Sequence, residues 1–168
     1  MLRRSIDIAV FGATGFTGRL VATHLATLYG DQLRIAAAGR DADRLDRLRV
    51  ALGEERISTI VADANDPESL KQLAASARVI ISTVGPYHSH GTGLVQACAE
   101  AGTDYCDLSA EPDWILGMIR EQEGQTFFWI REVEGHKRTA GFENAEQRNN
   151  HVNRTLQTDA DQSLWPNT

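Results

Sequence analysis

Short apolar runs and amphipathic stretches alternate along roughly the first 120 residues of the chain. Five runs rich in branched apolar residues and alanine predict strands at 6–11, 33–38, 57–61, 78–82 and 103–106. Helical spacing of apolar residues separates them. The resulting helices are expected at 19–29, from 41 to about 52, from 66 onward, and at 93–100. This alternation is typical of right-handed βαβ units, so we expect an α/β fold with a Rossmann-type, doubly wound parallel sheet.

Start and stop residues support these helices. Asp41 is the expected N-cap of the second helix, and Asp66 followed by proline opens the third. In the first helix, Gly30 provides the C-terminal stop. The apolar residues at helical spacing in the first helix, with one histidine among them, are Leu20, Val21, His24, Leu25 and Leu28.

The character of the chain changes after about residue 120. Residues 121–168 are rich in Glu, Gln, Asn, Arg and Thr and lack an amphipathic period. Residues 126–130 offer a partial sixth strand, but no apolar helix follows them. We therefore predict two regions, a Rossmann domain at 1–120 and a polar, poorly ordered C-terminal tail at 121–168.

Composition and charge exclude several classes of protein. With 42% apolar and 24% charged residues, the chain has the composition of a globular protein. The net charge of −6 disfavours broad binding to nucleic acid. No apolar run approaches the roughly 20 residues of a transmembrane segment, and no secretory signal is evident. Cys98 and Cys106 are expected to be buried, reduced thiols of a cytoplasmic protein, with a disulfide or redox pair as the alternative.

Three glycines join the first strand to the first helix, in the segment Gly12-Ala13-Thr14-Gly15-Phe16-Thr17-Gly18. In a dinucleotide-binding loop, the first permits the tight turn, the second lets a pyrophosphate approach the backbone, and the third allows the helix to pack closely. The helix start then presents free N–H groups to phosphates. Thr14 and Thr17 can add hydroxyl donors, and Phe16 can pack beside the cofactor. No Gly-Lys-Ser/Thr follows, which disfavours ATP or GTP hydrolysis.

The end of the second strand indicates which dinucleotide is bound. NAD-specific domains place a carboxylate there, whereas this strand ends at Gly39 and Arg40. A guanidinium can pair bidentately with the 2′-phosphate of NADP, so we favour NADP(H). Arg44 is a candidate second contact. The alternative is that Arg40 is simply an exposed arginine near Asp41 and Asp43.

Two further segments are candidates for cofactor contact. Asp63, after the third strand, could meet the adenine edge or cap a turn, and the sequence does not decide between these roles. Thr83, Val84, Gly85 and Pro86 follow the fourth strand at the carboxyl edge of the sheet, where ligands bind in such folds. Gly85 allows close approach of the backbone, and Pro86 stiffens the loop beside the nicotinamide end.

No catalytic residue is assigned from the sequence. His88 and His90 are expected to be exposed loop histidines, since no further ligands for a metal site are evident. Tyr87 could donate a proton, but the chain lacks the YxxxK pair of short-chain dehydrogenases. The acidic residues near the fifth strand are expected to cap helices or face solvent rather than act as acid–base catalysts, and these are Asp104, Asp107 and Glu111.

These segments, taken together, resemble the NADP-binding domain of the saccharopine dehydrogenase-like oxidoreductases. The match covers about residues 6–120, and its nearest branch resembles the bacterial trans-acting enoyl reductases. The motifs that carry it are residues 7–18, 38–40, 82–87, 98–103 and 105–109, followed by Glu111-Pro112. The resemblance implies an NADP(H)-dependent oxidoreductase that transfers a hydride to a carbonyl, imine or enoyl group of a small-molecule or lipid-type substrate.

The chain departs from the family pattern in two places. Ala110 stands where the family usually has glycine, and beyond about residue 120 we find only a faint echo at 140–143. The second, substrate-binding domain of the family is therefore expected to be missing, with the tail a truncated, frame-shifted or divergent end. Such a chain would bind cofactor yet be inactive alone. A non-catalytic NADP-sensing or regulatory protein is the alternative, and the oligomeric state is not predicted.

Overall fold

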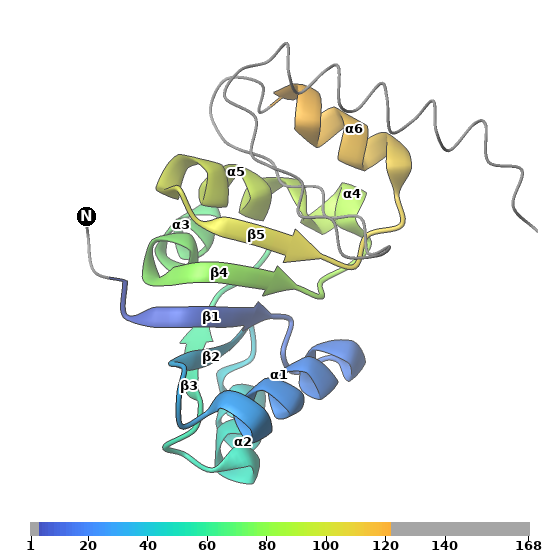
Figure 1. Ribbon diagram of the computed structural model, residues 1–168. Coiled ribbons are helices and arrows are strands. Elements are labelled where there is room, and N and C mark those ends of the chain that lie inside the picture. Colours follow the sequence, from blue (N-terminus) through green and yellow to red (C-terminus); the bar gives the residue numbers. More distant parts are fainter. Residues whose placement is uncertain (1–3, 122–168) are drawn as a thin grey trace, which may run out of the picture. The chain divides into compact units, whose positions relative to one another are not determined.

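The computed structural model describes residues 4–121, and these residues form an α/β domain (Figure 1). The strands are β1 (Ile6–Phe11), β2 (Ile35–Gly39), β3 (Ser58–Val61), β4 (Ala77–Ser82) and β5 (Asp104–Asp107). The helices are α1 (Phe16–Tyr29), α2 (Ala42–Leu52), α3 (Pro67–Ser76), α4 (Tyr87–His90), α5 (Thr92–Ala101) and α6 (Pro112–Glu121). The tail expected at 121–168, with its partial sixth strand, lies outside the described residues apart from residue 121.

All strand pairs in the sheet are parallel, and the strand order is β3-β2-β1-β4-β5. Helices α1 and α2 pack on one face of the sheet, and α3 and α5 pack on the other (Figure 1). The predicted doubly wound, Rossmann-type fold is therefore confirmed. The order reverses direction between β1 and β4, which is the point where such sheets bind ligands.

Alternate residues of the central strands supply two separate cores. On β1, Val10 faces the α1–α2 side, whereas Ala9 and Phe11 face the α3–α5 side. On β2, Ile35 and Ala37 share the first core with Val10. Both faces of these strands are buried, which explains why the strands read as continuous apolar runs.

The face by which α1 packs differs from the leucine stripe suggested by the sequence. Its buried residues are Gly18, Ala22 and Ala26, while Leu20 and Leu28 are 57% and 52% exposed. Small residues on both sides explain this arrangement, because the alanines of β2 and the small face of α1 let the helix lie close to the sheet. A leucine facing inward would hold the helix away.

The predicted helix caps are present. Asp41 Oδ1 accepts a hydrogen bond of 3.0 Å from the Arg44 amide at the start of α2. Asp66 caps α3 in the same way, with proline as the first helical residue. At the end of α1, the Gly30 amide donates to the Ala26 carbonyl. Each of these three helices thus begins or ends where its capping residue satisfies a terminal backbone group.

A single side chain ties the start of the domain to its far edge. The Arg4 guanidinium donates to the carbonyl of Ala77 at 2.8 Å and to Thr103 Oγ1 at 2.7 Å. It also donates to the carbonyls of Ala101 and Gly102, at the C-terminal end of α5. A cation is favourable there because the C-terminal end of a helix carries partial negative charge.

The two cysteines have different surroundings. Both are free thiols, and Cys98 is buried in the α3–α5 core as expected. The prediction of burial is wrong for Cys106, which is exposed on β5. β5 is the last strand in the order, so an apolar flanking sequence does not ensure that a neighbour covers its side chains.

Candidate functional site

The loops that follow β1 and β4 meet at the point where the strand order reverses. Thr83, directly after β4, donates from its amide and from its hydroxyl to the carbonyl of Phe11, both at 2.9 Å. This carbonyl lies immediately before the glycine loop. The two segments selected from the sequence, 12–18 and 83–86, are therefore brought side by side at the carboxyl edge of the sheet.

Two of the three loop glycines have no room for a side chain. Gly12 has a φ of +84°, and a Cβ added there would lie 2.7 Å from both Thr83 Oγ1 and Val84 Cγ2. A Cβ on Gly18 would lie 2.1 Å from the Gly12 carbonyl oxygen. The close approach predicted for α1 and the loop is thus visible as backbone packed against backbone.

Gly15 is less crowded than these two glycines. A Cβ there would meet only the Gly12 carbonyl oxygen, at 3.3 Å, and the φ of −77° suits any residue. Gly15 is the N-cap of α1, and no side chain caps this helix. Within residues 4–121, the amides of Phe16, Thr17 and Gly18 donate no hydrogen bond.

These three amides are the free donors that a helix N-terminus offers to an anion. Because Gly15 carries no side chain, the backbone beside them is accessible. The loop therefore fits the pyrophosphate of a dinucleotide. The side chain of Phe16 is 77% exposed at the first position of α1, which leaves one of its faces free for a ligand.

Two arginines follow β2 in the chain, Arg40 directly after the strand and Arg44 in α2. Arg40 is exposed and forms no hydrogen bond within the part of the chain that the structure describes. Arg44, from the first turn of α2, donates from Nη2 to the carbonyl of Thr14 at 2.9 Å. Arg40 is the arginine that the sequence favours for contact with the cofactor's 2′-phosphate, whereas Arg44 is the arginine that contacts the glycine loop.

Asp63 follows β3 and organises a turn. Its Oδ1 accepts from the amide of Asn65 at 2.9 Å, and its own amide donates to Ser69 Oγ. The turn-capping role left open by the sequence is therefore present. Contact with an adenine edge stays a prediction, as do the cofactor contacts of Thr83, Val84, Gly85 and Pro86.

The segment after β4 forms the short helix α4, where the sequence predicted a loop. The Glu111 carboxylate accepts from the amides of Tyr87 and His88, at 2.8 and 2.9 Å. It also pairs with His88 Nδ1 at 2.8 Å. The hydrogen bonds from the His88 and Tyr87 amides lower the pKa of Glu111. Glu111 therefore acts as a cap, as expected, but for a helix more than twenty residues earlier in the chain.

The hydroxyl of Tyr87 is engaged in hydrogen bonds within the domain. The ring is buried, packs beside Trp114, and its hydroxyl donates to the Ser82 carbonyl at 3.1 Å while accepting from the Leu108 amide at 3.3 Å. Burial raises its pKa. Tyr87 thus holds β4 and β5 together and is a poor proton donor for a substrate. His88, by contrast, is exposed.

The described residues offer neither a metal-binding cluster nor a membrane-spanning helix. Within residues 4–121, no three side chains of His, Cys, Asp or Glu gather in a way that could hold a metal ion. None of the helices described is long and apolar enough to span a membrane.

Comparison with known proteins agrees with this geometry. Residues 8–162 match the family model of the saccharopine dehydrogenase NADP binding domain, and this match extends past Glu111-Pro112, the last motif of the resemblance. A trans-acting enoyl reductase of Mycobacterium tuberculosis strain H37Rv is 50% identical over 110 residues, which are 64% of this chain and 26% of that protein. Its counterpart in Mycobacterium leprae is 49% identical over 111 residues, 65% of this chain and 26% of that protein. The chain thus spans about a quarter of the length of these curated relatives.

Solved structures share the fold at lower identity. Saccharopine dehydrogenase (L-Glu forming) from Saccharomyces cerevisiae has a TM-score of 0.57 at 21% identity, over 71% of this chain and 24% of that one. A short-chain dehydrogenase/reductase from Veillonella parvula, solved in complex with NADP, has a TM-score of 0.53 at 20% identity, over 62% and 47%. These likenesses establish the fold.

Proposed function

The chain belongs to the saccharopine dehydrogenase NADP-binding domain family, and from this premise we propose that it is the cofactor-binding part of an NADP(H)-dependent oxidoreductase. The expected reaction is hydride transfer to a carbonyl, imine or enoyl group. The names of the relatives favour the enoyl group. A small-molecule or lipid-type substrate and a cytoplasmic location are part of the same proposal.

The observation that carries the proposal is the uncapped start of α1. Three free amides and an accessible backbone at Gly15 form a site for two phosphates, and it lies beside the loop that begins at Thr83. In a sheet of this order, a dinucleotide lies across the reversal point with its pyrophosphate at the first helix. The loop after β4 would then border the nicotinamide end.

The chain's own residues have separate tasks in this proposal. The amides at the start of α1 would bind the pyrophosphate, and the exposed ring of Phe16 would shield one side of the bound molecule. Arg40 would lie on the adenosine side. Glu111 would keep α4, and with it the loop from Thr83, in place. NADPH supplies the hydride when bound.

Replacement of Gly15 by alanine tests this assignment directly. The added methyl group would lie 3.3 Å from the Gly12 carbonyl oxygen, a tight contact that a shift of a few tenths of an ångström relieves, so we expect the fold to tolerate it. The same methyl group would cover the backbone that the pyrophosphate approaches. We expect Gly15→Ala to weaken NADPH and NADH by a similar factor, about tenfold or more, since hydrogen bonds to charged groups are worth roughly 1.5–3 kcal/mol. Quenching of cofactor fluorescence measures both affinities.

Gly117→Ala is the matched control, because Gly117 lies in α6 and, among residues 4–121, no atom outside its own stretch of helix lies within 4 Å of an added Cβ. It should leave both affinities unchanged. If the unaltered chain bound neither cofactor, or if Gly15→Ala bound both as well as the unaltered chain does, the proposed site would be wrong. Hydride exchange with enoyl or imine compounds then distinguishes an enzyme from an NADP sensor, because a sensor would bind NADPH without exchanging its hydride.

A further inference from the structure

The outer side of α1 is poor in charge for a helix on the surface of the domain. Among the 14 residues of α1 only Arg19 carries a full charge at pH 7, whereas α2, on the same face of the sheet, has five charged side chains among its 11 residues (Figure 1). Surface helices normally present charged and polar side chains on the side opposite the core. The composition of α1 is therefore typical of a helix that is covered on both sides.

Leu20, His24 and Leu28 form a row on this outer side, four residues apart, and we call this row the α1 stripe. All three side chains are exposed, and both leucines expose more than half of their surface. The small residues of α1 face the sheet, so the stripe points away from the core. Rows of residues four apart are the ridges by which helices pack on one another. A helix from another molecule can therefore pack along the α1 stripe.

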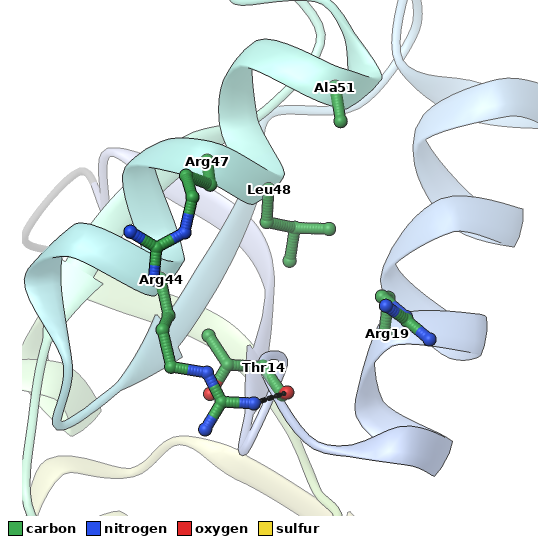
Figure 2. Close-up of a pocket in the computed structure, with 6 residues that line it drawn as sticks. All are labelled: Thr14, Arg19, Arg44, Arg47, Leu48 and Ala51. Atoms are coloured by element: carbon green, nitrogen blue, oxygen red, sulfur yellow. Dashed lines mark hydrogen bonds between the residues drawn. The ribbon is translucent and has the colours of Figure 1, made fainter.

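The charges near the two ends of α1 lack partners within residues 4–121. Arg19 lies in the first turn, Asp31 lies two residues after the last helical residue, and neither forms an ion pair there. Each is near the unfavourable end of the helix dipole, because helix N-termini attract anions and C-termini attract cations. Arg19 also lines a pocket of about 220 Å³ with Arg44 and Arg47 of α2, which adds repulsion between like charges (Figure 2). An opposite charge from another molecule would stabilise both ends.

We propose that α1 is the contact surface of a homodimer, in which the α1 helices of two copies pack antiparallel along their stripes. With the twofold axis beside His24, Leu20 of one copy meets Leu28 of the other. Position 31 of the other copy then lies opposite position 17, about 3 Å along the axis from Arg19 and within reach of its long side chain. The same arrangement thus pairs Arg19 with Asp31 twice.

A twofold interface uses the same surface on both molecules, and the α1 stripe with its flanking charges is complementary to itself in this sense. The stripe has no charge that would face its own copy across the axis, and the two end charges are opposite in sign. A second copy of the chain therefore fits this surface. The dimer goes beyond the proposed function, because it uses none of the residues assigned to the cofactor.

Sedimentation velocity of the full chain tests the dimer. Stable interfaces bury about 800 Å² on each partner, and a single pair of helices provides less, so monomer and dimer should be in equilibrium. Between about 1 and 500 µM, the mass should rise from 18.5 kDa towards twice that value. Leu20→Lys combined with Leu28→Lys should keep the chain monomeric throughout, because cations would enter the apolar contact. Leu108→Lys is the matched control, since Leu108 is 60% exposed beyond β5 and lies outside the stripe.

Charge reversal tests the antiparallel orientation. Arg19→Glu and Asp31→Arg should each weaken dimerisation by about 5- to 20-fold, because each replaces two exposed ion pairs by two repulsions. The two changes combined should restore the dimer to within about threefold of the unaltered chain, since opposite charges then face each other again. If the combined variant stayed as weak as either single variant, the antiparallel arrangement would be wrong.

Other results would overturn the dimer itself. A chain that sediments as a monomer at every concentration would do so, as would a double lysine variant that still dimerises. If the double lysine variant had a lower urea midpoint where the unaltered chain is monomeric, the stripe would pack within its own chain instead. None of these results depends on NADPH, so the proposed function is tested separately by the affinities of Gly15→Ala.

Discussion

Replacing Gly18 by alanine should destabilise the domain, although the same change in most helices is favourable. Gly18 lies in the first turn of α1, where alanine has the better intrinsic propensity by about 1 kcal/mol. The added Cβ, however, would lie 2.1 Å from the Gly12 carbonyl oxygen and 2.6 Å from Thr83 Oγ1. Cβ atoms do not approach an oxygen closer than 3.0 Å, so helix and loop must separate by about 0.9 Å.

The backbone carbonyl cannot rotate away as a side chain would. We therefore expect Gly18→Ala to lower the free energy of unfolding by about 3 kcal/mol or more, the upper end of the roughly 1–3 kcal/mol typical of overpacking. Urea unfolding measures this loss of stability, which we expect as a lower unfolding midpoint for Gly18→Ala with an unchanged dependence of the free energy on urea concentration. Gly117→Ala is the control, because no described residue beyond its own stretch of helix comes within 4 Å of the added Cβ, and it should be neutral or stabilising by up to about 1 kcal/mol. If Gly18→Ala were as stable as Gly117→Ala, the backbone contact would not exist and the close approach of α1 would be incorrect.

Three further changes have definite expected results. Thr103→Val removes a buried hydroxyl that donates to the Ala74 carbonyl, so stability should fall by about 1–3 kcal/mol in urea, and an unchanged midpoint would refute this role. Arg34 lowers the pKa of Asp7 from 3.8 to about 2, so its stabilising effect is complete above pH 3.8 and is lost as the pH falls towards 2. Asp7→Asn should therefore flatten that part of an acid-unfolding curve, and an unaltered curve would contradict the pairing. Glu111→Gln removes the charge that holds α4, so the α4 amides should exchange hydrogen faster at pH 7, with equal exchange as the opposing result.

Features that depend on neighbours in the sequence could be predicted from it. The strands, the Asp41 and Asp66 caps and the glycine loop are of this kind, because the responsible residues lie within one turn or one strand of one another. The sequence predicted a doubly wound parallel sheet but not the strand order β3-β2-β1-β4-β5, although right-handed connections leave few arrangements of five parallel strands. These features located the site at the carboxyl edge.

Features that depend on contacts far apart in the chain could not be predicted. The helix α4 is held by Glu111, and neither segment alone indicates a helix of four residues. The leucine spacing of α1 suggested a packed face, but the alanines of β2 bring the smaller face of the helix against the sheet. Arg44 lies thirty residues from Thr14 in the sequence, so its contact with the loop needed the three-dimensional structure.

The interactions of Arg4 have a consequence for where the domain begins. The first element of the fold, β1, begins at Ile6. The four hydrogen bonds of Arg4 reach the beginning of β4 and the end of α5, so the edge of the sheet is fastened by a residue outside every helix and strand. A shortened version that begins at Ile6 would keep every strand and helix but lose these four hydrogen bonds. We therefore expect a fragment that begins at Arg4 to be more stable than one that begins at Ile6.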